Sequence, residues 1–256
     1  MTAGGLDGYA PLGSYGGARE AVSRTRRRAA AAALVVCAFA VTAGSHGTSV
    51  IASEPPSTDR VVRIMPLGDS ITDGWGVPGG YRILLEDLLA ASGARFDFVG
   101  TLGNGPPELA DRDHEGHSGW RIDELDVGAN SWVAQLRPDV VLVLAGTNDV
   151  WQQFHLDLAP QRLLALLETL NRVAPGVRIV VASLPPLPDR AAERDAFNAS
   201  LPAVVATARA QGIAVVLTPS GSALTNEDLE DRVHPNQAGH GKLASAFHAA
   251  VIGSTP

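Results

Sequence analysis

Three short polar segments hold the groups that an acyl-transfer enzyme needs. The first is the Gly-Asp-Ser turn at residues 68–70, which directly follows an apolar run. The second is Asn148, which follows another apolar run, and the third pairs His234 with Asp231 in a D-x-x-H arrangement. A serine hydroxyl is a poor nucleophile until an imidazole takes its proton, and a carboxylate beside that imidazole fixes its tautomer. Together the segments predict a serine hydrolase with Ser70 as the nucleophile, His234 as the base and Asp231 as the partner of the base.

Attack by a serine places negative charge on the substrate oxygen, and that charge needs hydrogen-bond donors. We expect the side-chain amide of Asn148 and the backbone N–H groups of Ser70 and Gly119 to supply them, with Gly116 competing for the role of Gly119. Each segment also has a structural interpretation, because Gly, Asp, Asn and Ser all favour turns. The segment that ends at His234 could equally cap a helix. Only their joint presence favours catalysis.

The rest of the chain after residue 60 alternates between apolar runs and amphipathic stretches. Continuous apolar runs are typical of strands that are covered on both faces, and apolar residues spaced by 3.6 positions are typical of helices. The predicted strands are 61–67, 96–99, 140–145, 178–182 and 213–217. The predicted helices are 81–92, 122–136, 160–173, 190–210 and 235–251, the last with Pro235 as its first residue.

This alternation predicts an α/β fold, in which a five-stranded parallel sheet forms the centre of a three-layer α/β/α sandwich. Ligands of such sheets bind beyond the carboxyl ends of the strands. Ser70, Gly119, Asn148 and the Asp231–His234 segment all follow predicted strands. We therefore expect the fold to gather them at one edge, and we find no internal repeat and no second domain.

The first 59 residues differ in composition from the rest. A Gly- and Ala-rich tail, expected to be disordered, precedes four arginines between positions 24 and 28 and then the apolar stretch Ala29–Ala43. This is the pattern of a secretory signal, and the stretch is shorter than the ~20 residues of a membrane-spanning helix. We predict cleavage near Ala43 and a secreted protein, with a retained membrane anchor as the alternative. Residues 44–59 are interpreted as a linker and 60–256 as the enzyme domain.

Charge and cysteine content restrict the partners. The formal net charge is −7, and removing residues 1–43, with five arginines and two acids, would make it more negative. We therefore expect no binding to nucleic acid and no stable association with anionic membranes after signal cleavage. Cys37 is the only cysteine and lies in the predicted signal, so the mature protein should be stable without disulfides.

Two further groups of side chains have alternative interpretations. Residues 111–117 include two histidines and three acids, but they lack the spacing of a zinc site. We expect a polar loop there, no metal and no other cofactor. Trp75, Trp120 and Trp151 each lie within a few residues of a predicted catalytic group. Aromatic faces suit sugar rings or acyl groups, so all three are candidate substrate-binding residues, with core packing as the alternative.

Taken in order, four segments resemble the four blocks of the SGNH hydrolase superfamily, also called GDSL esterases and lipases. They are Gly68–Ile71, Gly119, Gly146–Asp149 and Asp231–His234. The resemblance implies a flavodoxin-like SGNH hydrolase fold and the catalytic and oxyanion roles given above. Longer segments look like the third carbohydrate esterase family, which includes acetylxylan esterases: Arg63–Thr72, Gly80–Arg82, Phe98–Gly100 and Asp113–Trp120.

We thus expect a secreted, cofactor-free serine esterase that removes short acyl groups, in the first place acetyl, from carbohydrate. One alternative is a GDSL lipase or lysophospholipase, for which a long apolar lid would be evidence, and the sequence shows none. The other is a non-catalytic sugar-binding module, which the intact serine, histidine, aspartate and asparagine argue against. A fold does not fix a substrate, so the identity of the polysaccharide stays open.

Overall fold

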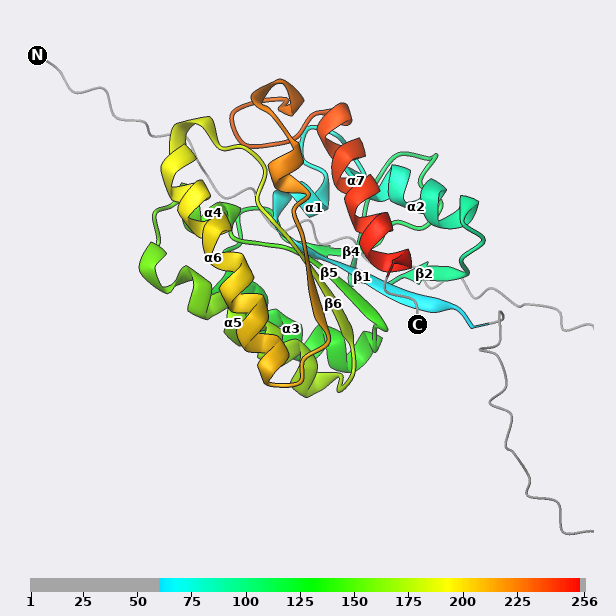
Figure 1. Ribbon diagram of the computed structural model, residues 1–256. Helices are drawn as coiled ribbons and strands as arrows, with labels where there is room; N and C mark the ends of the chain where they lie inside the picture. Colours follow the sequence, from blue (N-terminus) through cyan, green and yellow to red (C-terminus); the bar gives the residue numbers. More distant parts are fainter. Residues whose placement is uncertain (1–59, 254–256) are drawn as a thin grey trace, which may run out of the picture. The chain divides into compact units, whose positions relative to one another are not determined.

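The computed structural model describes residues 60–253, which form a central sheet between two layers of helices (Figure 1). The strands are β1 (Val62–Gly68), β2 (Phe96–Phe98), β3 (Leu102–Gly103), β4 (Asp113–Gly116), β5 (Val140–Leu144), β6 (Arg178–Ala182) and β7 (Val215–Thr218). The longer helices are α2 (Arg82–Ala91), α3 (Ile122–Leu136), α5 (Ala159–Val173), α6 (Ala191–Ala210) and α7 (Gln237–Ile252). Short helical turns are α1 (Ser70–Asp73), α4 (Thr147–Trp151), η1 (Leu156–Leu158), η2 (Pro188–Arg190), η3 (Gly221–Ala223) and η4 (Asn226–Asp228).

The order of the strands confirms the predicted fold class. Neighbours in the sheet are β3-β4-β1-β5-β6-β7, and β2 pairs with the first half of β1 on the edge where β4 pairs with its end. All pairs are parallel except β3 with β4. The five expected strands correspond to β1, β2, β5, β6 and β7. Strands β3 and β4 are additional, and they extend the sheet beside the end of β1.

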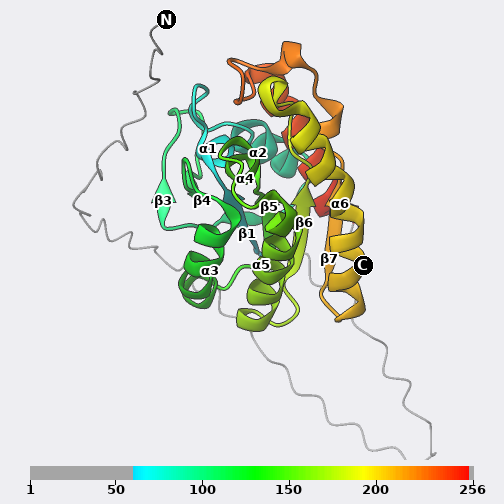
Figure 2. The same ribbon diagram turned by 90° about the vertical axis from the view of Figure 1, so that its left-hand side faces the viewer.

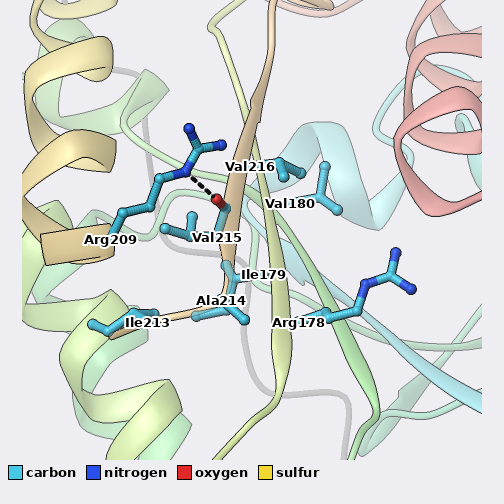
Figure 3. A pocket seen from close by; sticks show the side chains of 8 residues that line it. All are labelled: Arg178, Ile179, Val180, Arg209, Ile213, Ala214, Val215 and Val216. Atoms are coloured by element: carbon cyan, nitrogen blue, oxygen red, sulfur yellow. Dashed lines mark hydrogen bonds between the residues drawn. The ribbon is translucent and has the colours of Figure 1, made fainter. Parts of the chain in front are cut away.

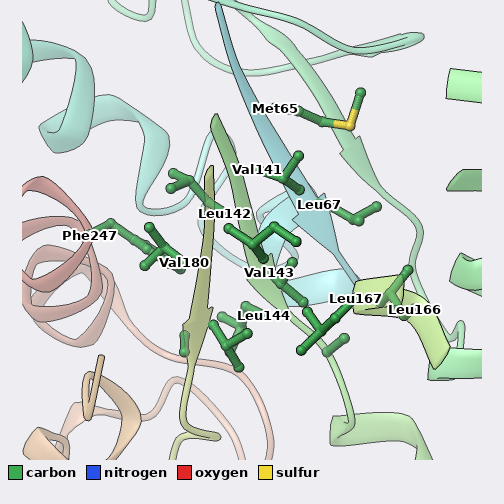
Figure 4. Close-up of a cluster of buried hydrophobic side chains, with 14 of the residues drawn as sticks. Met65, Leu67, Val141, Leu142, Val143, Leu144, Leu166, Leu167, Val180 and Phe247 are labelled. Atoms are coloured by element: carbon green, nitrogen blue, oxygen red, sulfur yellow. The ribbon is translucent and has the colours of Figure 1, made fainter. Parts of the chain in front are cut away.

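Helices cover both faces of the sheet, and for this reason its central strands are apolar throughout. Helices α3, α5 and α6 lie on one face, and α2 and α7 on the other (Figures 1 and 2). Every residue of β5 is buried. Figure 4 shows Phe247 of α7 beside Leu142 and Val180, with Leu166 and Leu167 of α5 on the other side of the sheet. This close packing holds the strand ends, and the segments that leave them, in fixed positions.

The long helices begin and end within two residues of the predicted positions. Helix α7 begins at Gln237 rather than at Pro235, because the side chain of Asn236 caps it by accepting a hydrogen bond from the Gly239 N–H at 3.1 Å. Pro235 instead forms an isolated bridge with Leu229. The residues around His234 thus belong to a loop before the helix, which leaves the imidazole outside the helical layer.

The predicted tail, signal and linker at residues 1–59 lie outside the described residues. Between residues 60 and 253, no helix combines the length and the apolar character that crossing a bilayer requires.

Candidate active site

Ser70 and His234 lie 164 positions apart in the sequence, yet their side chains meet. Ser70 Oγ is 2.9 Å from Nε2 of His234. The other ring nitrogen, Nδ1, is 2.8 Å from Oδ2 of Asp231. The three side chains therefore form one hydrogen-bonded row from hydroxyl to carboxylate. Such a row can take the proton from the serine and stabilise the imidazolium that results.

The end of β1 determines how Ser70 is presented. A Cβ on Gly68 would lie 2.3 Å from the carbonyl oxygen of Leu144, so only glycine fits where β1 and β5 approach. Asp69 is fully buried and caps α1, because its Oδ1 accepts a hydrogen bond from the Ile71 N–H at 3.0 Å. Burial raises the pKa of Asp69 to about 6, against the lowering effect of that hydrogen bond. Ser70 is the first residue of α1, so its own N–H has no acceptor within the helix.

The loop between β7 and α7 orients the base. Oδ1 of Asp231 accepts hydrogen bonds from the backbone N–H groups of Val233 at 2.6 Å and His234 at 2.7 Å, while Oδ2 faces the imidazole. Burial raises the pKa of Asp231, but the hydrogen bonds from the His234 ring and from the backbone outweigh it and leave the pKa lowered. The ionised carboxylate is therefore favoured, and it fixes the orientation of the ring.

Two of the predicted oxyanion donors also come to this edge of the sheet. Nδ2 of Asn148 donates one hydrogen bond to the carbonyl of Trp120 at 2.9 Å, which leaves its second N–H for a substrate. Gly119 has a left-handed backbone with φ of 84°, and its N–H has no acceptor among the described residues. The N–H of Gly116 instead donates to Nδ1 of His114 at 2.9 Å. Of the two competing glycines, Gly119 has the available donor.

His117 holds the Gly119 turn in place, a role that the sequence did not indicate. Its ring stacks between Trp120 and Trp132, with centroids 4.4 and 4.5 Å away. Nε2 of His117 lies 2.9 Å from Oε2 of the buried Glu115, and its backbone N–H donates to the carbonyl of Gly68 at 2.9 Å. The turn is thus tied to the end of β1, next to the nucleophile.

Asp149 has a second role that the sequence did not indicate, because it anchors the short helix that carries Asn148. Its buried carboxylate accepts hydrogen bonds from the Ile122 N–H at 3.0 Å and from the Arg162 guanidinium at 2.7 and 3.0 Å. Burial raises the pKa of Asp149 against these bonds. Because the partners belong to α3 and α5, the carboxylate joins α4 to the helical layer. Moving α4 away would leave the buried carboxylate of Asp149 without the guanidinium of Arg162, and an unpaired buried charge is costly. The ion pair therefore keeps α4 in place.

The predicted substrate-binding tryptophans have different surroundings. Trp75 is 46% exposed, and its ring centroid lies 6.0 Å from that of His234. Trp151, at the end of α4, is 40% exposed and has the guanidinium of Arg190 5.9 Å from its ring. Trp120 is partly buried in the stack with His117. The structure therefore places Trp75 at the surface beside His234 and Trp151 at the surface on the short helix that carries Asn148, and it places Trp120 against the core.

The histidines at 114 and 117 already have partners. Nδ1 of His114 accepts a hydrogen bond from Gly116, and burial lowers the pKa of His114 to about 3. The ring of His117 is engaged with Glu115 and the two tryptophans. Within residues 60–253, no group of three or more His, Cys, Asp or Glu side chains could hold a metal ion.

Two pockets lie away from the catalytic groups. One of about 330 Å³ surrounds the amino-terminal ends of β6 and β7, where Arg209 donates a hydrogen bond to the carbonyl of Val215 (Figure 3). It is at the opposite end of the sheet from Ser70, because β1, β6 and β7 run parallel. The other, of about 460 Å³, lies between η1 and α6. Ser70, His234 and Asn148 line neither of them.

Comparison with known proteins agrees with this geometry. A sequence profile of the GDSL-like lipase/acylhydrolase family matches residues 67–242. A multidomain esterase of Ruminococcus flavefaciens is 29% identical in an alignment of 237 residues that covers 80% of this chain and 30% of that protein.

Two solved structures are similar over almost their whole length. The family 3 carbohydrate esterase of Clostridium thermocellum has 32% identity and a TM-score of 0.68, covering 75% of this chain and 97% of that one. An acetyl esterase in which a serine is replaced by alanine, solved with an acetate ion, has 29% identity, a TM-score of 0.69 and the same coverage. The chain belongs to the GDSL-like lipase/acylhydrolase (SGNH) family, and it is an esterase related to carbohydrate esterase family 3.

Proposed function

We propose that the protein is a secreted serine esterase that removes short acyl groups, above all acetyl, from carbohydrate. One observation carries the catalytic part: Ser70 Oγ lies 2.9 Å from His234 Nε2, while Asp231 holds the opposite ring nitrogen. The substrate is supported by the relatives, because one is a carbohydrate esterase and another is an acetyl esterase that was solved with acetate.

In the first half-reaction, His234 takes the proton of Ser70 while Oγ attacks the acyl carbon. The oxygen of the tetrahedral intermediate accepts hydrogen bonds from the free N–H of Asn148 and from the backbone N–H groups of Gly119 and Ser70. The intermediate collapses as His234 gives its proton to the departing alcohol oxygen, which leaves an acyl-serine. Asp231 stabilises the imidazolium in between.

In the second half-reaction, water attacks the acyl-serine. His234 takes a proton from that water, the same donors stabilise the second tetrahedral intermediate, and the proton returns to Oγ of Ser70 as the acid departs. The ester and one water thus give one alcohol and one carboxylic acid. No step requires a metal or an organic cofactor.

A substrate panel tests the proposed function. The rates at which the full chain hydrolyses acetylated xylo-oligosaccharide, nitrophenyl esters of short and long acids, and lysophospholipid are measured under the same conditions. We expect the highest kcat/KM on acetyl esters, with acetylated sugar among the substrates. A clear preference for long acyl chains or lysophospholipid would contradict the proposal and favour a lipase.

Metal removal gives a second expected result. Because Ser70 and His234 suffice for acyl transfer, incubation with EDTA should leave kcat on an acetyl ester unchanged. Activity before and after dialysis against the chelator is compared, with the same protein in buffer as the control. A loss that zinc or calcium restores would point to a metal near His114 and His117 after all.

The proposed export rests on the basic and apolar sequence of residues 24–43. In a host that secretes the protein, the basic segment and Ala29–Ala43 should direct export, with cleavage near Ala43. Amino-terminal sequencing of protein from the medium checks the cleavage. Exported material that begins at Met1 would rule cleavage out.

A further inference from the structure

The glycine-rich loop after Ser70 presents Trp75 to solvent. Gly74 and Gly76 on either side have φ of 91° and 76°, a conformation that favours glycine. A Cβ on Gly74 would also lie only 2.7–2.8 Å from the backbone of residues 77, 79 and 80. The Trp75 N–H donates to the carbonyl of Ser70 at 3.0 Å. These features fix the backbone of Trp75 beside the nucleophile.

The indole of Trp75 does not serve as core. Trp120 and Trp132 pack against the hydrophobic core, whereas Trp75 is 46% exposed and its described ring neighbour is His234. The two rings are 6.0 Å apart and tilted by 35°. A large exposed aromatic side chain beside a reactive group is typical of a ligand contact.

The mechanism determines which part of the substrate lies there. His234 must give its proton to the oxygen of the departing alcohol, so that oxygen has to come within about 3 Å of Nε2. The alcohol is therefore on the His234 side of the reacting carbon, where Trp75 lies. The oxyanion donors Asn148 and Gly119 belong to other segments, which follow β5 and β4. The acyl oxygen faces them instead.

We infer that Trp75 is the platform for the alcohol part of the substrate, and that it binds a pyranose ring by stacking on its C–H face. The inference rests on the proposed function and deepens it. A pyranose with equatorial substituents has a flat, apolar C–H face that matches an indole, while a small alkyl alcohol has too little surface to cover it. Trp75 thereby determines specificity for the sugar rather than for the acyl group.

The test compares two acetyl esters that differ only in the alcohol, acetylated xylobiose and ethyl acetate. Trp75→Ala in the full chain should lower kcat/KM on acetylated xylobiose about tenfold, mainly through KM, because one aromatic contact is lost. On ethyl acetate it should stay within about twofold of the wild type. Trp75→Phe keeps an aromatic face and should recover most of the loss. Val127→Ala, which removes part of a 77% exposed side chain on α3, is the matched control and should change neither rate.

Equal losses on both esters would overturn the inference, since Trp75 would then only support His234. No loss on either ester would overturn it as well. A wild-type protein that hydrolyses ethyl acetate but not acetylated xylobiose would instead refute the proposed function, and the inference with it.

Discussion

Ser70→Ala and His234→Ala should each lower kcat on a short-chain acetate ester by a factor on the order of 10⁴ or more. The first substitution removes the nucleophile, and the second removes the base 2.9 Å from it. Because the two side chains act as one unit, the double variant should be little slower than either single variant. Asp231→Ala should have a smaller effect, because the imidazole remains but loses the carboxylate that orients it.

This series needs two controls, a check that each variant is folded and a substitution of a serine outside the site. Circular dichroism of each variant should match the wild type. Ser131→Ala changes an exposed serine on α3 and should leave kcat unchanged. If folded Ser70→Ala kept more than about a tenth of the wild-type kcat, the loss would be too small for a missing nucleophile, and the assignment of Ser70 would be wrong.

Asn148→Ala should lower kcat by roughly 10²–10³ with KM almost unchanged, which corresponds to about 3–4 kcal/mol of transition-state stabilisation. The reason is that the amide is one of three proposed donors to the oxyanion and acts on charge that exists only in the transition state. The variant also deprives the Trp120 carbonyl of its hydrogen bond, so its folding is checked by circular dichroism.

The matched control for this variant is Asn130→Ala, which alters an exposed asparagine on α3 and should keep kcat within about twofold, as is usual for surface changes. A higher KM with unchanged kcat for Asn148→Ala would mean that Asn148 binds the ground state and transition state equally. Such a result would remove it from the oxyanion hole.

The fold could be predicted from the sequence in those elements whose apolar residues show which positions are buried. Strand β5 is apolar throughout, and α5 carries apolar residues at helical spacing. Strand β4 could not be predicted, because Asp113–Gly116 is polar and resembles a loop. It forms a strand because β1 pairs with it and because distant groups satisfy its buried side chains, as Thr101 does for Glu115.

In the candidate site, likewise, the sequence predicts some of the residues and does not predict others. Asp231 and His234 interact three positions apart, and Ser70 lies two positions after the end of β1, so local sequence identifies all three. The supporting contacts join residues that are far apart in the chain. His117 meets Trp132 on α3, and Asp149 meets Arg162 on α5. Neither partner stands at a spacing that predicts contact, so only the folded chain reveals these pairs.

Covalent labelling of Ser70 tests the central claim most directly. A fluorophosphonate forms a stable bond with a serine oxygen only where a base activates that oxygen. After reaction with the intact protein, peptide mass spectrometry should find one adduct, on the peptide that contains Ser70, in step with the loss of esterase activity. Ser70→Ala should give no adduct, and His234→Ala should react far more slowly. Inactivation with the adduct on a different serine, or labelling of Ser70 with full activity retained, would contradict the account.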